Sequence, residues 1–168
     1  MATPYTIIDT DTHITEPADV WTSRVPAKWR DRVPRVEWDT KANEEAWFLG
    51  DKKLASAAGS AMAGWPEPFP SHPPTFEKAH AASYDASARL DYMDEIGVYA
   101  QVLYPNLGGF GSQAWWKMGE PELMLECVRA YNDFQIDWIE PDPKRFVPIL
   151  ATPYCCLLYT SPSPRDPE

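Results

Sequence analysis

The chain has 168 residues, enough for one ordinary globular domain, and its 44% hydrophobic content with eight tryptophans excludes a disordered protein. A formal net charge of −10 argues against nucleic acid or an anionic membrane as a partner. No apolar run approaches the roughly 20 residues of a membrane span, and no signal peptide begins the chain, so we expect a cytoplasmic protein.

The first stretch with chemical interest is Ile7–Pro17. Its β-branched start predicts a short buried strand. Alternate strand residues face the same side, so Asp9, Asp11 and His13 are expected to project together. A carboxylate and an imidazole two residues apart can bind one divalent metal ion as a pair. The alternative is that these side chains only cap the following turn.

The residues between Pro17 and Asp85 predict an excursion from the main fold. Val33–Trp38 and Glu45–Leu49 are predicted strands of a hairpin. The stiff, proline-rich segment Gly64–Pro74 is typical of a lid over an enzyme site. His72 and His80 lie in or beside this segment, and we expect them to be solvated rather than metal ligands.

A strand–helix–strand unit follows. Asp85 is a suitable N-cap for a helix that ends at Ile96. Val98–Tyr104 then predicts a second buried strand, parallel to the first. The following loop, Asn106–Gly111, would lie at the carboxyl ends of the strands. Asn106 is therefore a candidate substrate contact, or simply the first residue of a glycine-rich turn.

The last elements predicted are a helix from Pro121 to about Ile139 and a strand over Phe146–Ala151. Cys127 falls on the apolar stripe of the helix, which indicates a core residue rather than a nucleophile. The chain's three cysteines form neither a disulfide framework nor a zinc-binding pattern.

Four stretches in this order resemble the amidohydrolase-related family that includes aminocarboxymuconate-semialdehyde decarboxylase. The resemblance extends to about Pro153, and it implies a TIM barrel whose first strand ends in a pair of metal ligands. Here that pair would be Asp11 and His13. The four stretches are Ile7–Pro17, Arg89–Val98, Gln101–Pro105 and Ala130–Asp133.

A complete TIM barrel takes about 250 residues, so the expected fold is α/β, a truncated TIM (β/α)8 barrel. It would comprise about the first three βα units, with a long hairpin and loop insertion after strand 1. Glu16 is a candidate third oxygen ligand, a residue that orients His13, or an ordinary loop carboxylate. The family's other metal ligands and its catalytic residues are expected beyond this chain.

The resemblance implies one divalent metal ion, zinc foremost, with Mn or Mg also compatible because Asp11 is a hard oxygen ligand. Such a site can hydrolyse C–N or C–O bonds of a small organic acid. The alternatives are a metal-dependent non-oxidative decarboxylase (carboxy-lyase) of an aromatic or dienoic acid, and an inactive fragment. The partner expected is a small-molecule substrate, and a homodimer is left open for the complete protein.

The C-terminal stretch Cys156–Asp166 resembles a translated sequencing adapter. A genuine proline- and serine-rich tail is the alternative. We therefore expect residues 1–155 to be the N-terminal part of the barrel and residues 156–168 to be a non-native tail.

Overall fold

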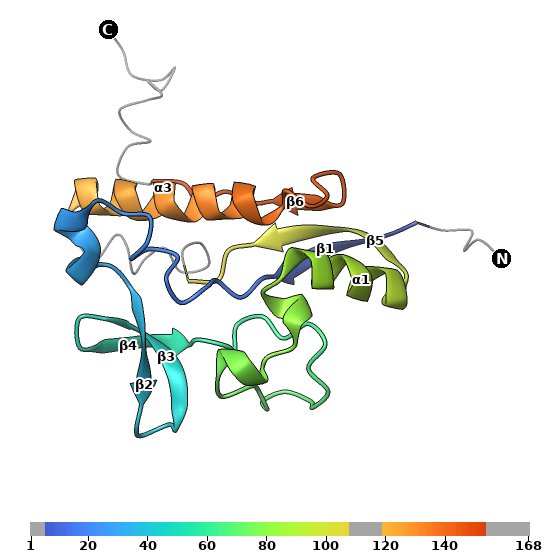
Figure 1. Ribbon diagram of the computed structural model, residues 1–168, viewed down its shortest axis with the longest axis horizontal. Helices are drawn as coiled ribbons and strands as arrows, with labels where there is room; N and C mark the ends of the chain where they lie inside the picture. The colour runs from blue at the N-terminus through green and yellow to red at the C-terminus, as the bar shows by residue number, and fades with distance from the viewer. Residues whose placement is uncertain (1–5, 108–118, 154–168) are drawn as a thin grey trace, which may run out of the picture.

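The computed structural model describes residues 6–107 and 119–153 (Figure 1). The predictions for the glycines at positions 108, 109 and 111, for Cys155 and for the tail from Cys156 lie outside these residues.

The centre of the fold is a three-stranded parallel sheet (Figure 1). Its strands are β1 (Ile7–His13), β5 (Val98–Tyr104) and β6 (Phe146–Pro148), in the order β1-β5-β6. Helices α1 (Ala86–Ile96) and α3 (Pro121–Trp138) precede β5 and β6. This arrangement confirms the predicted strand–helix–strand unit and places the carboxyl ends of β1 and β5 side by side.

The boundaries of α1 follow from two residues that the sequence indicated. The Asp85 carboxylate accepts a 2.7 Å hydrogen bond from the backbone N–H of Ala88, so it caps the first turn. Gly97 ends the helix with φ +77°, a left-handed conformation that glycine adopts without a steric penalty. Strand β5 begins at the next residue, as predicted.

An antiparallel sheet lies between β1 and α1 in the sequence. It contains β2 (Arg35–Asp39), β3 (Glu44–Leu49) and β4 (Lys52–Ser56), in that order. The first two strands confirm the predicted hairpin within two residues at each end. The third strand was missed because residues 54–64 are mostly small and show no alternating pattern.

Short 3-10 helices complete the fold: η1 (Ala27–Arg32), η2 (Phe76–Lys78) and η3 (Ala81–Ser83). The predicted third strand is shorter than expected, since it ends at Pro148. Beyond it, the backbone N–H of Ile149 still donates to the carbonyl of Leu103 at 3.0 Å, so the chain continues alongside β5.

The core joins the antiparallel sheet to α3 through Trp21, which is fully buried. Its ring meets that of Trp47 edge-on, with 5.1 Å between the ring centroids. Its indole N–H donates to the carbonyl of Cys127 at 3.1 Å. The Cys127 side chain is itself 1% exposed, and burial raises the pKa of its thiol to about 12. Cys127 is thus a core residue, as predicted.

Apolar side chains remain exposed around the parallel sheet. Both outer strands of this sheet, β1 and β6, are edges within the part of the chain that the structure describes. Ile8 is 55% exposed, although strands of this type are usually covered on both faces. The other exposed apolar residues of this region are Ile7, Tyr99, Val147, Ile149 and Leu150. Among the described residues, no helix is both long and apolar enough to cross a membrane.

Two glycines offer a matched test of packing in the insertion. Gly50 and Gly64 both have positive φ, +58° and +75°. A Cβ on Gly50 would meet nothing within 4 Å, whereas a Cβ on Gly64 would lie 2.5 Å from the ring of His80.

We expect Gly50→Ala to cost about 1 kcal/mol of unfolding free energy from backbone strain alone. Gly64→Ala should cost about 2 kcal/mol more, because the His80 ring must also move. Urea unfolding of both variants measures the difference. Equal losses would show that the ring packs loosely over Gly64.

Candidate metal centre

Strand β1 contains a bulge just before its carboxyl end. Asp9 pairs with Gln101 and Thr12 pairs with Leu103, so β1 advances three residues while β5 advances two. Such an irregularity changes which side chains share a face of the sheet.

The bulge separates Asp9 from His13. His13 pairs with Tyr104, three residues beyond Gln101, and residues three apart on a strand point to opposite faces. Gln101 faces α1, because its side chain accepts a 3.0 Å hydrogen bond from Arg89 of that helix. Asp9 therefore lies on the α1 side and His13 on the other side. The expectation that Asp9 projects together with His13 is wrong.

The His13 ring is held in one orientation. Its Nδ1 lies 3.0 Å from the carbonyl oxygen of Tyr104, at the end of the neighbouring strand. A carbonyl can only accept, so Nδ1 carries the proton and the lone pair is on Nε2. Histidine metal ligands commonly show this arrangement, in which the other ring nitrogen donates to a backbone carbonyl. The donor set of His13 therefore fits a metal ligand.

Asp11 has an exposed side chain, and its backbone N–H donates to the Asp9 carboxylate at 3.2 Å. In residues 6–107 and 119–153, histidine, cysteine and acidic side chains nowhere form a group of three or more that could hold a metal ion. Asp11 and His13 could supply at most two ligands, and a closed metal site needs further ones.

Glu16 links the loop after β1 to the loop after β5. The side chain is 1% exposed, and its Oε1 accepts hydrogen bonds from the backbone N–H groups of Asn106 and Leu107, both at 3.1 Å. The Asn106 side-chain amide donates to the Ile14 carbonyl at 2.6 Å and lies 3.4 Å from Glu16 Oε2. The two candidate site residues Glu16 and Asn106 therefore contact each other.

Burial raises the pKa of the Glu16 carboxyl, and the hydrogen bonds from the backbone of Leu107 and Asn106 oppose this in part. Burial and the nearby Glu16 charge raise the pKa of the Tyr131 hydroxyl as well. Tyr131 accepts a hydrogen bond from the Gln135 amide. The buried Tyr131 hydroxyl of α3 is thus close enough to Glu16 to be influenced by its charge.

Sequence reasoning missed the role of Arg89. This side chain is fully buried, and burial lowers the pKa of its guanidinium to about 10, so it stays charged at neutral pH. It donates to the carbonyls of Ala82 and His13 and to the side chain of Gln101. The available signal was an arginine placed between Ala86 and Met93 on the buried face of α1.

Comparison with known proteins rests on structure alone. No protein-family model matches the chain, and no curated protein does. The fold is similar to the crystal structure of the amidohydrolase map2389c from Mycobacterium avium subsp. paratuberculosis K-10, with a TM-score of 0.63 and 19% sequence identity. The match covers 89% of this chain and 42% of that one.

The chain has an amidohydrolase-like fold. It spans less than half the length of that amidohydrolase. The match and the parallel sheet confirm the predicted α/β class.

The insertion of this amidohydrolase-like fold carries its own charged group around Glu44. Its carboxylate contacts Lys53 Nζ and His72 Nε2, both at 2.7 Å, and Lys53 also contacts Asp39 at 2.7 Å. Hydrogen bonds to Glu44 and to the Pro70 carbonyl raise the pKa of His72. Burial raises the pKa of Glu44, but the bonds from Lys53 and His72 outweigh it and leave this pKa low. His72 therefore ties the proline-rich segment to the antiparallel sheet, a role the sequence did not indicate.

The bond between His72 and Glu44 predicts a pH dependence of stability. The pKa of His72 is raised in the folded state, so its contribution is complete below about 6.5 and is lost as pH rises through the folded pKa. Lys53 and Asp39 face the same group and keep their charges over this range.

We expect the free-energy difference between the wild type and His72→Gln to shrink between about pH 6 and pH 8. Chemical unfolding at both pH values measures it. In a Glu44→Gln background the same substitution should show little pH dependence. A constant difference in both backgrounds would contradict the assignment.

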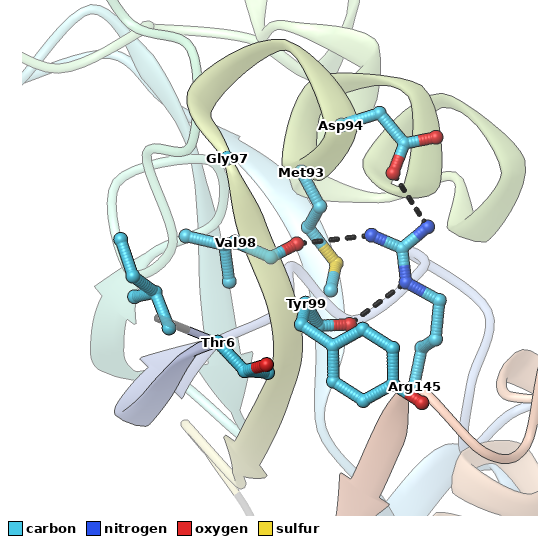
Figure 2. Close-up of a pocket in the computed structure, with 8 residues that line it drawn as sticks. Thr6, Met93, Asp94, Gly97, Val98, Tyr99 and Arg145 are labelled. Atoms are coloured by element: carbon cyan, nitrogen blue, oxygen red, sulfur yellow. Dashed lines mark hydrogen bonds and ion pairs between the residues drawn. The ribbon is translucent and has the colours of Figure 1, made fainter. Parts of the chain in front are cut away.

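A hollow of about 450 Å³ lies at the opposite end of the parallel sheet (Figure 2). Arg145 lies beside it and donates to the carbonyls of Tyr99 and Val98 at 2.8 and 2.9 Å, while its Nη1 pairs with Asp94 at 2.7 Å. In barrels of parallel strands, active sites form at the carboxyl ends of the strands. The hollow is at the amino ends, so it is not the candidate centre.

Proposed function

We propose that this chain is the first part of a metal-dependent hydrolase of the amidohydrolase-related family, in which Asp11 and His13 bind one divalent metal ion. The observation that carries the proposal is the His13 ring. It lies at the carboxyl end of β1, on the side of the sheet away from α1, with Nδ1–H donated to the Tyr104 carbonyl. The amidohydrolase-like fold supports the same reading.

The barrel is proposed to continue beyond the described residues. Both edges of the parallel sheet lack a neighbouring strand among residues 6–107 and 119–153. A closed barrel has no such edges, and additional strands would cover Ile8 and Val147, which are now 55% and 47% exposed. The remaining ligands would come from those strands.

The proposed substrate is a small organic acid with a C–N or C–O bond to be cleaved. A bound zinc ion lowers the pKa of its water ligand toward neutrality, and Mn or Mg would also suit the Asp11 oxygen. The chain's own residues then have separate tasks. His13 presents Nε2, Asp11 supplies a hard anionic ligand, and Glu16 holds the β5 loop beside them.

Metal titration of this chain tests the pair. With Co²⁺ as a probe, we expect His13→Ala and Asp11→Asn each to weaken binding at least as much as the roughly 10–100-fold typical for loss of an outer partner. His72→Gln is the control, since His72 and Glu44 form an imidazole–carboxylate pair in the antiparallel-sheet insertion, outside the proposed centre. Binding that depends on His72 and not on His13 would overturn the proposal.

Sequencing of the parent DNA beyond codon 155 tests the barrel. We expect about five more βα units, the number that completes eight, with histidines and a late aspartate at strand ends. A genomic stop directly after the Cys156–Glu168 stretch would remove the barrel and the hydrolase together. With the longer protein in hand, release of carbon dioxide without hydrolysis would identify the decarboxylase alternative instead.

A further inference from the structure

Arg89 joins three separate segments at the carboxyl end of β1. Its guanidinium donates to the Ala82 carbonyl in η3, to Gln101 Oε1 in β5 at 3.0 Å, and to the His13 carbonyl at 3.0 Å. The side chain is fully buried. A buried guanidinium costs several kcal/mol of desolvation unless its donors are satisfied. The three acceptors, including the carbonyl at the end of β1, are therefore held in place around Arg89.

The same chain of bonds continues to Asp9. The amide of Gln101 accepts from Arg89 and donates through Nε2 to Asp9 Oδ2 at 3.1 Å. Asp9 Oδ1 in turn accepts the backbone N–H of Asp11 at 3.2 Å. The Gln101 amide thus links the Arg89 guanidinium to the Asp9 carboxylate on the α1 side of the sheet. We call these bonds the Gln101–Asp9 relay.

The relay holds both ends of the tripeptide that carries the candidate ligands. Asp9 holds the N–H of Asp11, and Arg89 holds the carbonyl of His13. The backbone between these two bonds continues the strand after the bulge, and its course places the His13 ring on the face opposite Asp9. The bulge alone does not fix that geometry, because β1 is an edge strand in the described residues.

We propose that Arg89 is the positioning residue for the Asp11 and His13 metal pair, acting through the His13 carbonyl and through the Gln101–Asp9 relay. This inference rests on the proposed function. Lysine could not replace Arg89, because one ammonium group lacks the planar fork that reaches three acceptors in different segments.

The test compares Arg89→Met with Arg145→Met in this chain. Arg145 is a matched control, since it also donates to two backbone carbonyls and lies at the other end of the same sheet (Figure 2). We expect both variants to lose stability. Only Arg89→Met should weaken Co²⁺ binding, by roughly the 10–100-fold typical of partners one shell beyond a metal.

A second readout does not need the metal. The ¹⁵N shifts of the His13 ring report its tautomer, and we expect the Nδ1–H form to lose its dominance in Arg89→Met but not in Arg145→Met. If Arg89→Met does not fold, Gln101→Met cuts only the relay and should weaken Co²⁺ binding several-fold. Arg89→Lys should not restore the wild-type affinity.

The outcomes separate the two proposals. Unchanged Co²⁺ affinity and an unchanged His13 tautomer in Arg89→Met and Gln101→Met would overturn the role of Arg89 and leave the metal pair standing. Equal weakening in Arg145→Met would also overturn it, as a general effect of stability. If wild-type Co²⁺ binding does not depend on His13, the proposed function fails, and the ring tautomer alone then decides whether Arg89 positions His13.

Discussion

Replacement of Trp21 by alanine is expected to lower the free energy of unfolding by about 3–5 kcal/mol, the range for removal of a buried tryptophan. The cost is large because Trp21 is fully buried and touches two parts of the fold. It packs edge-on against Trp47 of β3 and donates its N–H to the Cys127 carbonyl in α3.

Trp38→Ala is the control, because Trp38 is 50% exposed on β2. It should cost about 1 kcal/mol or less. Trp21→Phe keeps a ring against Trp47 but loses the indole hydrogen bond to the Cys127 carbonyl and leaves a small cavity, so it should cost about 1–3 kcal/mol. Urea unfolding of the three variants gives the order. A Trp21→Ala loss no greater than that of Trp38→Ala would show that the two sheets do not depend on this ring.

The second large effect is expected at Glu16. Glu16→Ala leaves the backbone N–H groups of Asn106 and Leu107 without their acceptor, and each buried unsatisfied donor costs about 1–3 kcal/mol. We expect a loss of about 3 kcal/mol and faster hydrogen exchange at these two amides. Glu95→Ala, at an exposed position of α1, should change stability by less than about 0.5 kcal/mol.

Glu16→Gln keeps the shape of the side chain but removes its charge. The pKa of Glu16 is raised in the folded state, so the native chain binds more protons than the unfolded chain above about pH 4.5. The wild type should therefore lose stability relative to Glu16→Gln as pH rises through this region. If the wild type gains stability instead, the Asn106 and Leu107 bonds stabilise the carboxylate more than burial penalises it.

The sequence alone was sufficient for elements with local signals. Asp85 and Gly97 fix the ends of α1 through a cap and a left-handed turn, both of which depend on neighbouring residues. Strand β5 and the hairpin follow from their alternation and their flanking turns. Strand β4 was missed because Leu54 and its small neighbours become a strand only by pairing with β3.

The site was only partly predictable for the same reason. His13 was expected at the end of β1, and it lies there. The position of Asp9 on the other face depends on the register between β1 and β5, which no local pattern encodes. The burial of Glu16 and Arg89 likewise depends on partners about ninety and seventy-six residues away.

The bulge in β1 also limits which insertions and deletions the gene can tolerate. Removal of one residue between Asp9 and Thr12 would restore equal advance of the two strands and remove the bulge, but it would leave the His13 side chain on its present face, opposite Tyr104. Removal of two would leave Asp9 and His13 only two residues apart, so both side chains would face α1, and it would shorten the strand before its carboxyl end. The length of this short interval is therefore as much a part of the site as the identity of the residues within it.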